Sequence, residues 1–316
     1  MLRLLFRRLV AAAPTLLLVT LGVSLLLSIA PGDPALTIAG GAGEPSREQV
    51  EAVREKFHLD DSPFVQYGRW ASGAVVLDFG TAYTGSGPVR DQIWSRLPIT
   101  AGLAFAAVAI ALLLAVPLGT VAGARSGGML DRLSRMISTL GVSIPNFCLA
   151  ILLVVVVAVD RRWLPSGGFV RLTDDPVEWL RHTLLPAATL GFGLAGVLSR
   201  QLRGSLVDVL DSRFVQAAWA RGCTRRTVVG KHGLKNAAIA PITVLGVQVG
   251  YLLGGTVIVE MIFGIPGLGP YMLKGITDRD LPVVQGVTFV FVLWQMAASF
   301  LVDVAYGLLS PKARLD

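Results

Sequence analysis

Charged side chains are scarce in this chain, at 16% of 316 residues, whereas 53% of the residues are hydrophobic and the mean hydropathy is +0.65. Soluble domains carry roughly 25% charged residues. A chain of this length would be long enough for a large soluble core, but its apolar residues gather in long blocks that contain no charge at all. The shortage of charge therefore argues against a soluble protein.

Cysteine and histidine are also rare, with two and three residues. Cys148 falls in an apolar block and Cys223 in a basic loop, so we expect no disulfide between them. The histidines are scattered without metal-ligand spacing, so we expect no metal and no other cofactor. The phosphate-binding pattern GxxxxGK[ST] is missing, so the chain is not expected to hydrolyse ATP by itself. Because His, Asp and Ser do not cluster at one depth, nothing suggests a membrane enzyme.

Six blocks free of charge are each predicted to be a transmembrane helix, because about 20 apolar residues span a bilayer. These blocks are Leu9–Ala30, Leu97–Ala124, Met136–Val159, Thr183–Ser199, Asn236–Val259 and Leu281–Val302. The fourth is short and is expected to borrow residues at either end. Prolines in or beside these blocks are tolerated in lipid when neighbouring helices satisfy the freed backbone groups. The pattern predicts an all-α membrane protein with about six transmembrane helices packed as a bundle.

Lys and Arg divide unequally between the two sides of such a bundle. One side carries 16 Lys and Arg against 4 Asp and Glu, over residues 1–8, 125–135, 200–235 and 310–316. The other side carries 12 against 15, over residues 31–96, 160–182 and 264–280. Positive loops stay in the cytoplasm. We therefore expect both termini and the 200–235 loop in the cytoplasm, and the net charge of +7 gives no reason to invoke nucleic acid.

The long outer loop, residues 31–96, carries two helix signals. Ser46 is predicted to cap a helix to about Phe57, with Gln49 in the position that completes a capping box. A second helix is predicted from Pro63 to about Val76, where aromatic residues recur at helical spacing. The loop is either a small helical cap on the bundle or a docking surface for an extracytoplasmic partner, and both readings can hold.

The cytoplasmic loop at residues 200–235 is the most informative segment. A short helix around Phe214 is predicted to end at Gly222, because glycine permits the left-handed conformation after a helix. Thr224 is predicted to cap a second helix toward Asn236. The small Ala217 and Ala218 allow close backbone approach, which suits an element pressed against a partner. A solvated basic loop is the alternative.

The order of residues in this loop resembles the EAA…G loop of bacterial ABC importer permeases, through Ala217-Ala218 and Gly222. Motifs along essentially the whole chain resemble the B-type permease subunit of dipeptide, oligopeptide and nickel importers. They are Arg7-Arg8 with Pro14, Ala30-Pro31-Gly32-Asp33-Pro34, Leu59-Asp60, Gln66-Tyr67 with Trp70, Asp78-Phe79-Gly80, Arg96-Leu97-Pro98, Pro266-Gly267-Leu268-Gly269 and Pro282-Val283-Val284-Gln285-Gly286. Gln216 stands where the loop usually has Glu, Trp219 where Arg is common, and Ser310-Pro311 where Asp-Pro is common.

The resemblance implies a type I ABC importer permease fold in a bacterial cytoplasmic membrane, with a helical extracytoplasmic loop between the first two spans. It divides the chain into residues 1–30, the outer loop 31–96 and a core permease domain 97–316. The implied partners are a homologous C-type permease subunit, two cytoplasmic ATP-binding subunits and an extracytoplasmic binding protein. Peptide is the implied cargo, with a nickel chelate, glutathione or a haem-like compound as alternatives; an ATP-independent channel is an alternative of another class.

The resemblance also implies that the short cytoplasmic helix couples the permease to the ATPase. The coupling residues are then Phe214, Gln216, Ala217, Ala218, Arg221 and Gly222. Two acidic residues at the edges of predicted spans, Glu260 and Asp303, are candidates for a gate or for the substrate path, because ionisable residues at membrane depth are costly. Loop anchoring or a salt bridge is the alternative for each.

Overall fold

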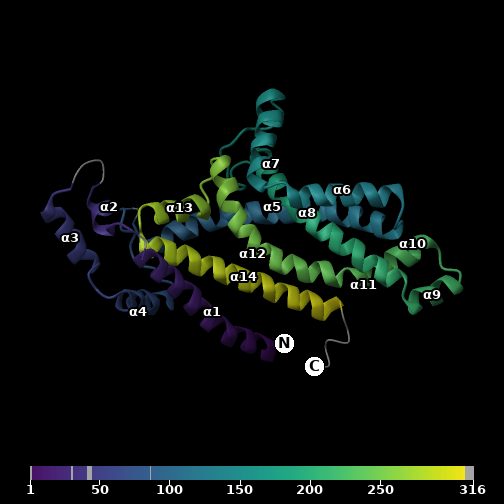
Figure 1. Ribbon diagram of the computed structural model, residues 1–316, viewed down its shortest axis with the longest axis horizontal. Coiled ribbons are helices and arrows are strands. Elements are labelled where there is room, and N and C mark those ends of the chain that lie inside the picture. The colour runs from purple at the N-terminus through teal and green to yellow at the C-terminus, as the bar shows by residue number, and fades with distance from the viewer. Residues whose placement is uncertain (1, 30, 41–44, 86, 310–316) are drawn as a thin grey trace. The chain divides into compact units, whose positions relative to one another are not determined.

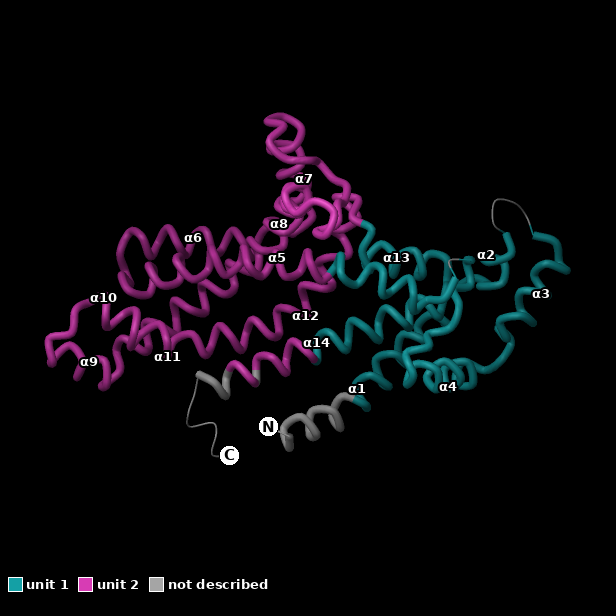
Figure 2. Tube along the Cα trace, turned by 180° about the vertical axis from the view of Figure 1, so that it is seen from behind, with its two compact units in different colours: residues 1–100, 266–296 teal, residues 101–265, 297–316 magenta. Residues whose placement is uncertain are grey.

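The chain is helical in its computed structural model, which describes residues 2–29, 31–40, 45–85 and 87–309. Over these residues the helices are joined by loops, and an isolated antiparallel bridge pairs Thr81 with Pro88. The chain divides into two compact units (Figure 2). Unit 1 comprises residues 1–100 and 266–296, and unit 2 comprises residues 101–265 and 297–316.

Four helices in the described ranges are long and apolar enough to cross a membrane, and up to six spans result if each of two bent helix pairs is one span. The four helices are α5 (Val89–Ala124), α8 (Pro176–Leu210), α12 (Ile239–Ile262) and α14 (Leu281–Leu309), whereas α1 (Leu2–Ile29) belongs to one of the bent pairs (Figure 1). The prediction of about six spans is confirmed. The fourth block extends at both ends, as expected, because α8 includes charged residues before and after it.

The third predicted span is not one helix. α6 (Met129–Ser143) is followed by α7 (Asn146–Leu153) and the π-helical η1 (Val154–Asp160), and the chain bends by 101° at the break. Pro145 stands at this break, and Ile144 before it is extended, with φ −82° and ψ 120°. A residue that precedes proline is forced out of the helical region. The block Met136–Val159 is therefore interrupted at Pro145, and it counts as one span only if the bent pair is taken together.

Unit 1 contains the segment predicted to be the outer loop, here called the outer segment, with helices α2 (Pro34–Gly40), α3 (Arg47–Phe57) and α4 (Pro63–Ala74), together with α13 (Leu268–Thr277). Ser46 caps α3 in a capping box with Gln49, as predicted. The sequence did not predict α2 or α13. An apolar cluster joins α4, the start of α5, α13 and α14; its fully buried members are Phe79, Val89, Ile93, Leu268, Val283 and Val287.

Polar contacts in unit 1 tie segments that lie far apart in the sequence. The buried Asp280 accepts hydrogen bonds from the backbone N–H of Thr84, at 3.0 Å, and from its hydroxyl, at 3.2 Å. The guanidinium of Arg279 donates to the carbonyl oxygens of Gly32, at 2.9 Å, and of Pro31. Arg54 forms an ion pair with Asp33 at 2.5 Å. The outer segment is therefore joined to the loop between α13 and α14.

Helices α6 and α8 of unit 2 pack through small residues. A β-carbon on Gly196 of α8 would lie 2.6 Å from the carbonyl oxygen of Ser138 on α6, so only glycine fits there. The hydroxyls of Ser138 and Ser199 are hydrogen-bonded at 2.7 Å. Small residues and interhelical hydroxyl bonds are the means by which membrane helices associate, because lipid supplies no hydrophobic drive.

Candidate functional site

The loop at residues 200–235 folds as a helical elbow. The first arm is α9 (Arg213–Ala220), and Gly222 after it has φ +78°, which is the left-handed conformation predicted for it. Thr224 accepts a hydrogen bond from the backbone N–H of Thr227 and starts the second arm, as predicted. This arm runs through α10 (Arg225–Thr227), the π-helical η2 (Val228–Leu234) and α11 (Lys235–Ala237) to α12. Figure 1 shows α9 and α10 together at one end of unit 2.

One face of α9 is anchored inside unit 2. Val215 and Ala218 are buried and pack against Val228 of η2, with Val209 and Leu210 of α8 beside them. We expected both Ala217 and Ala218 to allow close backbone approach to a partner, but the two residues differ in the structure. Ala218 lies against the chain itself, whereas Ala217 is exposed.

Two exposed aromatic side chains flank the buried face of α9, one on each side of it. Phe214 is 48% exposed and Trp219 is 44% exposed. The side-chain amide of Gln216 donates to the carbonyl oxygen of Asp211 at 3.2 Å, and Arg221 Nε donates to that of Ala217 at 3.3 Å. These two contacts hold the polar side chains close to their own helix. The exposed face is therefore rigid at its base and partly apolar at its surface.

An ion pair joins α6 and α8 beside the elbow, and a hydrogen bond joins the elbow to α5. Asp131 of α6 is fully buried and accepts two hydrogen bonds from Arg203 of α8, at 3.1 Å from Nε and 3.0 Å from Nη2. It also accepts the backbone N–H of Gly127 at 2.9 Å. Arg225, at the start of the second arm, donates to the carbonyl oxygen of Ala124 at the end of α5. The ends of α5, α6 and α8 are thus connected to each other and to the elbow.

The structure describes the side chain of Glu260 but not that of Asp303, the other acidic candidate. Glu260 is fully buried in α12, two residues before that helix ends, and its backbone carbonyl accepts the N–H of Ile265 at 2.8 Å. Asp303 belongs to α14, and its side chain lies outside the described part of the chain. A gate or path role stays a prediction for both residues.

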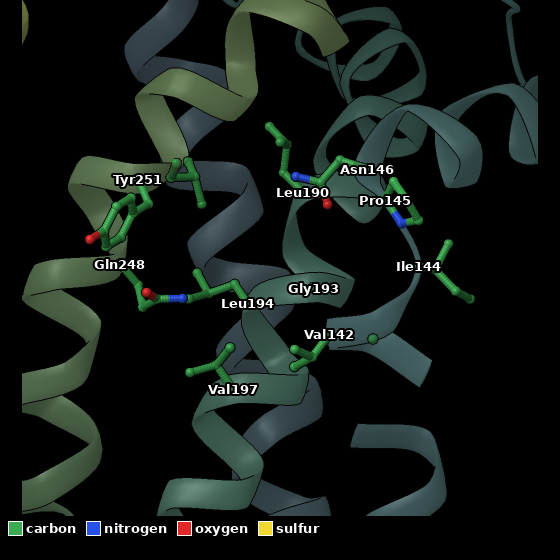
Figure 3. Close-up of a pocket in the computed structure, with 12 residues that line it drawn as sticks. Val142, Ile144, Pro145, Asn146, Leu190, Gly193, Leu194, Val197, Gln248 and Tyr251 are labelled. Carbon is green, nitrogen blue, oxygen red and sulfur yellow. The ribbon is translucent and has the colours of Figure 1, made fainter. Parts of the chain in front are cut away.

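A pocket that the sequence did not reveal lies between α7, α8 and α12 in unit 2 (Figure 3). Its volume is about 310 Å³, at the lower end of the range for small-molecule sites. It begins where α6 breaks before α7. The lining residues are Gly141, Val142, Ile144, Pro145, Asn146, Leu190, Gly193, Leu194, Val197, Gln248, Tyr251 and Leu252. The sequence signal was weak: isolated polar residues in apolar blocks.

Family comparisons agree with this architecture. The family described as "Binding-protein-dependent transport system inner membrane component" matches residues 115–315, and the N-terminal part of such membrane components matches residues 1–104. A Brucella abortus protein provisionally named a peptide transport system permease is 37% identical over 313 residues, covering 99% of each chain. The glutathione transport system permease protein GsiC of Escherichia coli K12 is 37% identical over 314 residues, again covering 99% of each chain.

Solved structures give the same fold. The inward-facing MetNI methionine ABC transporter has a chain with a TM-score of 0.58 at 18% identity, covering 69% of this chain and 96% of its own. An amino acid ABC transporter solved with histidines has a TM-score of 0.52 at 15% identity, covering 68% and 93%. The all-α permease fold predicted from the sequence is confirmed. The chain is a multi-pass membrane protein of the binding-protein-dependent transport system inner membrane component family, a permease subunit of an ABC importer.

Proposed function

We propose that this permease forms half of the path for di- or oligopeptides across a bacterial cytoplasmic membrane. A homologous C-type permease subunit supplies the other half, an extracytoplasmic binding protein delivers the peptide, and two ATP-binding subunits hydrolyse ATP. Both termini and the elbow lie in the cytoplasm, in keeping with the division of Lys and Arg. Residues 31–96 act as the outer segment and residues 97–316 as the core permease domain.

The exposed face of α9 is the observation that carries the coupling proposal. Phe214 and Trp219 are aromatic side chains that are half exposed on either side of the buried face of this helix. Exposed aromatic residues on a rigid base are typical of interface hot spots. The helix meets the ATP-binding subunit through Phe214, Gln216, Ala217 and Arg221, while Ala218 and Gly222 hold its position. Movement of the subunit is then transmitted through η2 and α11 to α12.

Peptide is the preferred cargo because the relatives are named for peptides or for glutathione, which is itself a tripeptide. Import assays with peptide, glutathione, a nickel chelate and haem as competitors test this preference. If the import of a labelled peptide is inhibited by unlabelled peptide and by none of the other three competitors, the proposal is supported. Import of the nickel chelate or haem without any import of peptide would refute it.

The coupling proposal is tested with Phe214→Ala and with two substitutions at Gly222. Phe214→Ala removes an aromatic hot spot, and truncating such a residue costs about 2 kcal/mol or more of binding free energy. A β-carbon at Gly222 meets no atom within 4 Å, so the effect there depends on φ alone. Gly222→Val introduces a β-branched residue at positive φ and should fail, whereas Gly222→Asn tolerates the left-handed conformation and should work.

The measurements are peptide import and peptide-stimulated ATP hydrolysis by the assembled complex, with retention of the ATP-binding subunits on purification. Thr173→Ala, in an exposed loop far along the chain from α9, is the matched control and should behave as the wild type. Phe214→Ala and Gly222→Val should lose import and stimulated hydrolysis, or lose the ATP-binding subunits. Wild-type import by both variants with those subunits attached would show that the elbow does not transmit the signal.

A further inference from the structure

The pocket between α7, α8 and α12 contains two side-chain carboxamides without hydrogen-bond partners. Asn146 and Gln248 both line it, and neither side chain forms a hydrogen bond within the described part of the chain. Gln248 lies in α12, which is long and apolar enough to cross a membrane, and Asn146 lies in the bent pair that is counted as one further span. Both residues are half-buried, so their amide groups remain open to a hydrogen-bonding partner from outside the chain.

The position of Asn146 is fixed by glycines on two neighbouring helices. A β-carbon on Gly193 of α8 would lie 3.2 Å from Asn146 Oδ1, and one on Gly255 of α12 would lie 3.3 Å from Asn146 Nδ2. The Asn146 amide is therefore packed closely against both helices, and a side chain at either glycine would have to displace it by a few tenths of an ångström. Figure 3 shows Asn146 on one side of the pocket and Gln248 with Tyr251 on the other, with Leu190 and Leu194 between them.

The chemistry of the lining selects its partner. None of the twelve lining residues is charged or is a histidine or cysteine. Two carboxamides each offer both N–H donors and a C=O acceptor, and the phenol of Tyr251 can serve in either role. The complement of this set is a neutral group that also has one N–H and one C=O. A backbone peptide group has these two atoms, and the aliphatic side chains on α8 offer apolar contact to the side chains beside it.

We propose that this pocket is a cargo subsite, in which Asn146 and Gln248 hydrogen-bond a neutral peptide group of the passing substrate. The inference rests on the proposed peptide-importer function and deepens it, since it names the atoms of the cargo that are recognised. It assigns specificity-determining contacts to the permease itself. The break at Pro145 has a role in this site, because it brings the first residue of α7 to the pocket.

The test compares amide cargo with ester cargo. The complete complex is reconstituted in liposomes with its binding protein, and import is measured for leucine homopeptides of two and five residues and for analogues in which ester oxygen replaces one amide N–H. The ester keeps the shape and removes the donor. The binding protein is the same throughout, so its own preference cancels when the amide-to-ester ratio of a variant is divided by that of the wild type.

Gln248→Met removes the carboxamide and keeps the length of the side chain, and it is expected to lower the amide-to-ester ratio about 2- to 10-fold, the effect of one neutral hydrogen bond. Asn146→Leu is expected to act in the same direction, and co-purification of the ATP-binding subunits shows whether it assembles. The control is Val247→Leu on α12, whose side chain is 53% exposed and does not line the pocket. It should leave the ratio unchanged.

Three outcomes would overturn the subsite. An unchanged ratio in Gln248→Met with import intact would mean that the carboxamide does not meet the peptide. An equal fall in amide and ester import would mean that the residue supports structure or meets the second permease subunit. If the wild-type complex imports neither homopeptide, the proposed peptide function itself fails and the subsite falls with it, which separates this result from the first two.

Discussion

Replacement of Asp131 by asparagine should destabilise unit 2 more than any other single change of charge at the end that carries the elbow. The carboxylate is fully buried, accepts hydrogen bonds from Arg203 Nε and Nη2 and from the Gly127 N–H, and lies 3.5 Å from Arg135 Nε. Breaking a buried ion pair by removing one partner costs about 3–5 kcal/mol, because the other charge stays buried. Arg203 keeps 28% exposure, so water can hydrate it in part. We therefore expect about 2–3 kcal/mol, below the full cost of a buried pair.

The assay is thermal unfolding of the detergent-purified complex. One kcal/mol corresponds to about 2–4 °C in a chain of 150–250 residues, so Asp131→Asn should lower the midpoint by about 4–12 °C. Asp208→Asn on α8 is the control: its side chain is exposed, and the change should cost less than about 0.5 kcal/mol. The pair Asp131→Asn with Arg203→Gln should be less damaging than the sum of the two single changes. A midpoint for Asp131→Asn within about 1 °C of the wild type, less than about 0.5 kcal/mol, would refute the reasoning.

Three further expectations concern the outer segment and the orientation. Burial raises the pKa of Asp280, so the folded carboxyl holds its proton more tightly than the unfolded chain does. The protonated carboxyl should stabilise unit 1 at low pH, and this stabilisation should be lost as the pH rises above 3.8 and through the raised pKa of the folded state. In thermal melts, Asp280→Asn should flatten this dependence of stability on pH, and an unaltered profile would contradict the prediction. Glu51→Lys should weaken stimulation of ATP hydrolysis by the binding protein, and full stimulation would leave residues 31–96 as a structural cap. Glu51 is a cleaner probe than Arg54 because Arg54 already pairs with Asp33 and Asp60. A reporter active only outside the cytoplasm should work when fused after Asp61 and fail after Asp316; the reverse would overturn the orientation.

Sequence reasoning succeeded where a few neighbouring residues decide the structure. The cap of Ser46, the left-handed Gly222 and the cap of Thr224 each depend on residues within four positions, and each is present. It failed where distant segments decide. From the sequence alone, Pro145 is compatible with a mild kink inside one span, because membrane helices tolerate proline. In the structure the chain bends by 101° there, and α7 packs against α8 and α12, which are distant in the sequence.

The candidate sites follow the same rule. Gln248 and Asn146 are single polar residues in apolar blocks, about 100 positions apart, and nothing local connects them. The pairing of Asp131 with Arg203 joins residues 72 positions apart. The elbow, in contrast, was predictable because its caps, its glycine and its basic second arm are contiguous. Its buried face was not, because Val215 and Ala218 are covered by α8 and η2 rather than by near neighbours.

The contacts of Arg279 and Asp280 have a consequence for how the protein is made. Gly32 and Arg279 are separated by 247 positions, and Thr84 and Asp280 by 196, so one part of unit 1 is translated well before the segment that completes it. Synthesis proceeds at roughly 5–20 residues per second, so the outer segment waits on the order of 10–50 seconds for its partner loop. During that interval the apolar surface later covered by α13 and α14 is open. Assembly of the outer segment is therefore a late step, before which a newly inserted chain exposes apolar surface to proteases and chaperones.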